Sequence, residues 1–73
     1  MSTDSIEELQ ETERECLSKF RSRATKLAAS YPGASRETLF ARAVEQMPQT
    51  AGRYQHARSL LQLSGIRALP LFE

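Results

Sequence analysis

Apolar residues recur at steps of three and four along the first thirty residues, the spacing of one face of an α-helix. That stripe consists of Ile6, Leu9, Cys16, Leu17, Phe20, Ala24, Leu27, Ala28 and Tyr31. It thins near Thr12 and Glu13, where the same face offers polar side chains. The pattern therefore predicts a long helix that is firm over 13–30, preceded by an acidic, frayed arm over 1–12.

Two shorter helices are predicted after this one, separated by turn signals. The sequence Tyr31-Pro32-Gly33 ends the first helix, because proline disfavours a helical residue before it and glycine permits a left-handed turn. Ser35 is the expected N-cap of the second helix and Thr50 that of the third. Proline at 48 and glycine at 65 are expected to end them. Their apolar stripes are Leu39, Phe40, Ala43, Val44 and Met47, and then Tyr54, Ala57, Leu60 and Leu61.

The predicted fold class is all-α: a small three-helix domain over 13–66, with a long first helix, a short second helix and a third. An extended apolar tail over 67–73 follows it. The large residues at the centre of each stripe are expected to be buried together, namely Leu27, Phe40, Val44, Tyr54 and Leu61. Ile66 and Leu69 are expected to close this core. For Leu71 and Phe72, core closure and a linear motif for a partner both stay open.

Composition excludes several kinds of function. The chain has 73 residues, enough for one small domain, with one cysteine (Cys16) and one histidine (His56). A single cysteine makes no internal disulfide, and the pair falls short of the four ligands of a structural zinc site. No recognisable acid–base pair accompanies either residue. We therefore expect no catalytic activity, no metal, no cofactor and no small-molecule ligand.

Two further patterns predict a location in the cytoplasm. The opening stretch "MSTDSIEELQ" is acidic and lacks the basic and then apolar layout of a signal peptide. No apolar run approaches the ~20 residues that a membrane span needs, so no membrane partner is expected. A lone cysteine also suits a reducing compartment.

Charge is unevenly distributed, although the net charge is only +1. Residues 1–15 carry six acids against one base, whereas residues 16–73 carry nine bases against three acids. This division indicates either that the two ends meet different partners or that the charges suit the dipole of their own helix. A basic run follows the acids, consisting of Lys19, Arg21, Arg23 and Lys26. We expect it to be a solvated face. If it has a functional role, the expected partner is an acidic protein surface or nucleic acid.

The predicted third helix has a polar face that could read DNA, with Gln49, Arg53, Gln55, His56, Arg58, Ser59 and Gln62. Arginine and glutamine are suited to base edges and phosphates in the major groove. The preceding turn, "EQMPQT", has methionine and proline where a helix-turn-helix usually has glycine. The pI of about 7.9 is low for a DNA-binding domain. A DNA-binding repressor is therefore the second hypothesis.

Two short stretches resemble replication proteins. "ALPLF" in the tail is similar to the motif with which proteins bind the bacterial sliding clamp, although Ala68 stands where that motif has glutamine. "AVEQMPQTAGRY", with the later "ALP", resembles the theta subunit of the bacterial replicative polymerase. These resemblances imply a replisome or sliding-clamp accessory protein as a third hypothesis.

In length, Arg/Ala/Leu-rich composition and layout, the whole chain is similar to small bacteriophage regulators of the Xanthomonas phage type. That resemblance implies a protein that binds a subunit of host RNA polymerase, inhibits initiation and promotes antitermination by protein–protein contact. Such a regulator is our first hypothesis. The resemblance rests on no motif, so it assigns no functional role to any particular residue of this chain. From the residues alone, the expected partner-binding set is Arg36, Arg42, Arg53, Arg58, Leu69, Leu71 and Phe72.

Overall fold

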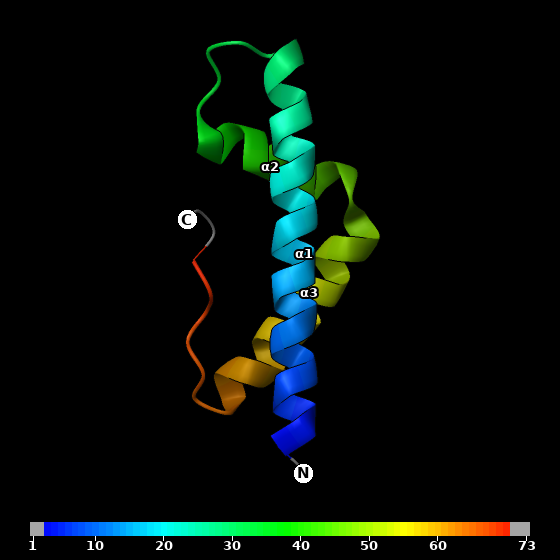
Figure 1. Ribbon diagram of the computed structural model, residues 1–73, viewed down its shortest axis with the longest axis vertical. Helices are drawn as coiled ribbons and strands as arrows, with labels where there is room; N and C mark the ends of the chain where they lie inside the picture. Colours follow the sequence, from blue (N-terminus) through cyan, green and yellow to red (C-terminus); the bar gives the residue numbers. More distant parts are fainter. Residues whose placement is uncertain (1–2, 71–73) are drawn as a thin grey trace.

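A computed structural model describes residues 3–70 of the chain and the side chains of residues 6–70. It contains three helices, α1 (Thr3–Ser30), α2 (Arg36–Gln46) and α3 (Pro48–Leu63), and no strand within the described range. Both shorter helices pack against α1, α2 towards its C-terminal end and α3 along its N-terminal half (Figure 1). The prediction of an all-α, three-helix domain is confirmed.

The long helix α1 sets the shape of the molecule. Its 28 residues correspond to about 42 Å at 1.5 Å per residue, which accounts for most of the 45 Å long axis. Helical geometry already begins at Thr3, so residues 3–12 continue the same helix without a break. The predicted fraying of this arm concerns its stability and stays a prediction. None of the helices in the described range is long and apolar enough to cross a membrane.

The turn between α1 and α2 forms as the sequence predicts. The Tyr31 N–H donates to the Leu27 carbonyl at 2.9 Å, which completes the last turn of α1. Gly33 then adopts a φ of +92°, in the left-handed region that glycine enters without a Cβ penalty. Ser35 caps α2, because its hydroxyl accepts the Thr38 N–H at 3.2 Å.

The junction between α2 and α3 differs from the prediction. Thr50 was expected to cap the third helix, but α3 begins at Pro48 and its N-cap is Met47. Proline is favoured at the first helical position, because its fixed φ suits the helix and its missing N–H would have no partner there. Pro48 therefore ends α2 and begins α3 at the same point.

A Schellman motif ends α3 and reverses the chain. Gly65, with a φ of +77°, donates its N–H to the Gln62 carbonyl at 3.0 Å, and Ile66 donates to the Leu61 carbonyl at 2.9 Å. Residues 66–70 then run back along α1 towards α2 (Figure 1). The termination at Gly65 thus directs the tail along the bundle.

The core lies where all three helices meet. Its buried cluster consists of Cys16, Leu17, Phe20 and Phe40, and Val44, Met47, Ala51, Tyr54 and Leu69 pack partly buried against it. The Phe20 ring, 1% exposed, lies edge-on to both Phe40 (centroids 5.5 Å apart) and Tyr54 (6.0 Å).

The predicted core set is therefore only partly right. Phe40 and Leu61 are buried, whereas Leu27 is half-buried and lies outside the central cluster. Leu27 follows Phe20 by seven residues, so it lies about two turns further towards the C-terminus of α1. The helix α3 packs against the N-terminal half of α1 and does not reach that level. The core is centred on Phe20 for that reason.

Candidate functional site

A charged side chain lies at the centre of the contact between α1, α3 and the tail. Glu13 is 0% exposed, and its Oε2 accepts two hydrogen bonds. One comes from Arg58 Nη1 at 3.3 Å and the other from the Leu69 N–H at 3.1 Å. Its other oxygen, Oε1, is buried and has no hydrogen-bond partner among the residues described. Glu13 therefore joins three segments that lie far apart in the sequence.

Arg58 completes this contact from α3. Its side chain is 17% exposed, and Nη2 donates to the Ile66 carbonyl at 3.3 Å. One guanidinium thus holds both the carboxylate of α1 and the backbone of the tail. We call Glu13, Arg58, Ile66 and Leu69 the tail latch. Breaking a buried pair of this kind leaves the remaining charge without a partner, which is strongly destabilising.

Sequence reasoning missed the tail latch because Glu13, although placed on the face of the apolar stripe, was treated as a gap in the stripe and counted with the other acids of residues 1–15. The available signal was its register: Glu13 occupies the helical face on which Leu17 and Phe20 lie. A carboxylate in an apolar stripe must find a partner when the stripe is buried. The expectation that Ile66 and Leu69 help to close the core agrees with the structure, since both are half-buried and Leu69 packs on the central cluster.

An open groove of about 420 Å³ lies between α1 and α2. Among the described residues, its lining is mostly apolar and includes two guanidinium groups: Arg21, Ala24, Thr25, Ala28, Arg36, Leu39 and Phe40. Small side chains on α1 create the space, since Ala24 and Ala28 are one helical turn apart. Of the predicted partner-binding residues described here, Arg36 alone lines this groove.

A second hollow, of about 210 Å³, lies beside the basic part of α1. It is lined by Ser18, Lys19, Ser22, Arg23, Lys26 and Met47. The three basic side chains are exposed, and Met47 adds a half-buried thioether where α2 meets α3. We call Lys19, Arg23 and Lys26 the basic face. Arg21, from the same basic run, lines the groove instead.

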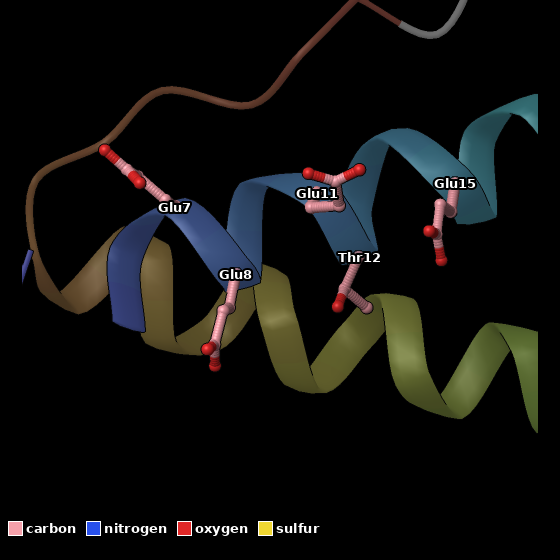
Figure 2. Close-up of a pocket in the computed structure, with 5 residues that line it drawn as sticks. All are labelled: Glu7, Glu8, Glu11, Thr12 and Glu15. Atoms are coloured by element: carbon pink, nitrogen blue, oxygen red, sulfur yellow. The ribbon is translucent and has the colours of Figure 1, made fainter. Parts of the chain in front are cut away.

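The acidic half of α1 also borders a shallow hollow, but its carboxylates do not converge. Figure 2 shows Glu7 and Glu11 pointing away from α3, whereas Glu8 and Glu15 point towards it or past it. Within the described part of the chain, no three His, Cys, Asp or Glu side chains are grouped closely enough to hold a metal ion. This end of α1 is an exposed acidic surface.

The predicted partner-binding arginines do not form one surface. Arg42 lies over the Tyr31 ring, 5.2 Å from its centroid, near the α1–α2 turn. Arg53 lies 3.8 Å from Glu15, with both side chains about half exposed. Arg58 is engaged in the tail latch, as is Leu69 through its backbone. Leu71 and Phe72 lie outside the described residues.

The single cysteine and the single histidine lie in different surroundings. Cys16 is buried on the apolar stripe, and this burial raises the pKa of its thiol, so the reactive thiolate is disfavoured at neutral pH. His56 is exposed on α3. Burial, and next the charge of Glu13, also raise the pKa of Tyr54.

The polar face of α3 is divided by the packing. Gln55, His56, Ser59 and Gln62 are exposed and Arg53 is accessible beside them, but Arg58 is turned towards α1. If α3 were a recognition helix, Arg53 would therefore be available for contact with DNA, whereas Arg58 would not.

The comparisons with known proteins identify no relative: no protein-family model, no curated protein and no solved structure matches this chain.

Proposed function

We propose that this chain regulates bacterial transcription by protein–protein contact, with its basic face docking on an acidic surface of an RNA polymerase subunit. Such contact would inhibit initiation and promote antitermination. The proposal of protein contact rests on one observation: α1 is divided into an acidic half and a basic half. The choice of RNA polymerase rests on the resemblance of the chain, in length, composition and layout, to phage regulators.

The divided helix favours a protein over duplex DNA. Lys19, Arg23 and Lys26 are exposed within about 11 Å of helix axis, beside the half-buried Met47. The next turns towards the N-terminus expose four acids, Glu15, Glu11, Glu8 and Glu7. A duplex lying along α1 would bring its phosphates against those acids. A protein surface can instead present acids to the basic half alone, and complementary patches of this kind steer association.

A DNA-binding repressor is the second candidate, supported by the exposed polar residues of α3. The inward position of Arg58 weakens it. We do not extend the proposal to the sliding clamp, because Leu69 of the clamp-like stretch packs on the core of its own chain.

The test uses purified Xanthomonas RNA polymerase and two variants with the same change in charge. Lys19→Glu/Arg23→Glu reverses the basic face, whereas Arg14→Glu/Arg67→Glu reverses two exposed bases outside it. Affinity for the polymerase, measured by surface plasmon resonance, should fall about tenfold or more for the first variant and far less for the control. Inhibition of transcription in vitro should follow the same order.

Three outcomes would contradict the proposal. The first is polymerase binding that both variants weaken equally, and the second is no binding by the wild-type chain. The third is tight binding of the wild-type chain to duplex DNA with a steep salt dependence, which is the mark of phosphate contact.

A further inference from the structure

We propose that one exposed, charged side of α1 is the docking surface for a second copy of this chain, with which it forms an antiparallel dimer of two-fold symmetry. Six exposed side chains define this charged stripe: Glu8, Glu11, Glu15, Lys19, Arg23 and Lys26. The inference goes beyond the proposed function, and its test contains this chain alone. Because the stripe includes the basic face, the dimer competes with any other partner of that face.

The stripe follows the spacing of a helix–helix seam. Steps of four, three, four, three and four residues lead along one side of α1, through Glu8, Thr12, Glu15, Lys19, Ser22 and Lys26. All of these side chains are exposed except Thr12, which is half-buried. Lys26 follows Glu8 by 18 residues, or about 27 Å of helix axis. The acidic hollow and the hollow beside the basic face both border this line. This side of α1 is therefore accessible to another helix over that length.

The charges of the stripe are complementary to the same stripe read in reverse. Position 17 is the midpoint, and each acid has a base at the same number of residues on the other side of it. When a second α1 lies antiparallel with its midpoint at the same level, each acid of one copy meets a base of the other. A two-fold axis closes this contact at two chains. The pairs are Glu15 with Lys19, Glu11 with Arg23, and Glu8 with Lys26, at two, six and nine residues from the midpoint.

The interactions within α1 do not account for this arrangement. The helix dipole acts on charges in the first and last turns, whereas the last turn of α1 contains no basic residue. Neighbours four residues apart repel at Glu11 and Glu15 and again at Lys19 and Arg23, and only Glu15 and Lys19 attract. Glu15 also has an ion pair with Arg53, at 3.8 Å, in which both side chains are about half exposed. A second copy places bases beside the repelling acids and acids beside the repelling bases.

The strength of the contact follows from its chemistry. The two-fold axis doubles the three acid–base pairs, but exposed ion pairs each contribute little to stability. The dimer is therefore reversible, and salt dissociates it by screening the charges.

Exchange of charges at the two ends of the stripe tests the pairing. Arg23→Glu/Lys26→Glu places acids opposite Glu8 and Glu11 of the second copy, and Glu8→Lys/Glu11→Lys places bases opposite Arg23 and Lys26. Neither variant should self-associate, whereas their mixture should form a heterodimer, because the acids of one chain meet the bases of the other. A single chain with all four changes keeps the net charge and restores every pair, so it should dimerise as the wild type does.

Sedimentation equilibrium at about 20 mM and about 500 mM salt measures each association, with circular dichroism to verify the fold. The wild-type chain should dimerise at low salt, with a dimerisation Kd that rises about tenfold or more at high salt. The control Arg14→Glu/Arg67→Glu changes the net charge as much as Arg23→Glu/Lys26→Glu does, but away from the stripe, and should still dimerise.

Four outcomes would overturn the inference. They are a wild-type chain that stays monomeric at millimolar concentration and low salt, a wild-type chain that forms assemblies larger than a dimer, a dimer that Arg23→Glu/Lys26→Glu leaves intact, and a mixture of the two variants that stays monomeric. None of them bears on polymerase binding, which surface plasmon resonance measures separately.

Discussion

The two seams along α1 are closed by different means. Against α3, the seam is covered by the tail and contains the buried charge of Glu13, held by Arg58 and the Leu69 backbone. Against α2, aromatic packing closes the seam at Phe40, and an apolar groove lies further along between the two helices. Apolar burial supplies most of the stability of a domain this small, whereas hydrogen bonds with defined geometry fix where each segment lies.

Phe20 belongs to both seams, so its loss should have the largest effect. Phe20→Ala removes a nearly inaccessible ring that contacts Phe40 on one side and Tyr54 on the other. We expect a loss of about 4 kcal/mol in the free energy of unfolding, enough to unfold a domain of this size. Phe40→Ala should cost somewhat less, because its side chain is 9% exposed. Thermal and urea melts followed by circular dichroism measure both, and wild-type midpoints would refute the packing.

Glu13 affects the α3 seam alone. Glu13→Gln keeps the shape of the side chain but leaves Arg58 without a counter-charge, and we expect it to cost about 2–3 kcal/mol. The matched control is Glu15→Gln, which removes the exposed partner of Arg53 and should cost less than about 1 kcal/mol. Equal effects of the two variants in urea melts would show that the tail latch contributes nothing particular.

Alkaline pH should weaken the packing around Phe20. Burial raises the pKa of Cys16 from 9.0 and that of Tyr54 from 10.0. A group whose folded pKa lies above its unfolded value contributes stability below the unfolded pKa and loses it as pH rises through the folded pKa. The free energy of unfolding should therefore fall as pH rises above about 9. Tyr54→Phe should reduce the part of this fall that occurs above pH 10, and an unchanged profile in that variant would contradict the assignment.

The smallest effect is expected at the N-terminal arm. Ile6 and Leu9 are only half-buried, so deletion of residues 1–12 should cost less than about 1–2 kcal/mol. Amide hydrogen exchange should show residues 6–12 opening more readily than Leu17 and Phe20. Equal protection along the whole of α1 would show that the arm does not fray.

Much of the fold could be predicted from local signals. The left-handed turns at Gly33 and Gly65, which follow the ends of α1 and α3, and the cap at Ser35 depend on the conformational preferences of single residues. The start of α3 was misassigned because Pro48 can both end one helix and begin the next. The stripes identified most buried positions, but where the helices cross α1 depends on tertiary packing, which no local pattern contains.

The candidate sites were less predictable than the fold. Arg58 was counted among the bases available to a partner, yet its role depends on Glu13, which lies 45 residues earlier in the chain. The basic face is smaller than the basic run identified in the sequence, because α1 turns Arg21 towards the groove and leaves Lys19, Arg23 and Lys26 exposed around Met47. Contacts between distant segments decide which charges remain accessible.

Exchange of one amide proton tests the central claim that a buried carboxylate anchors the tail to α1. In the wild-type chain, the Leu69 N–H should be protected from exchange, because it donates to the inaccessible Glu13 Oε2. In Glu13→Ala, with native helical content verified by circular dichroism, this protection should be lost while that of Phe20 persists. A Leu69 amide that exchanges in the wild-type chain as fast as that of the exposed Arg67 would contradict the account.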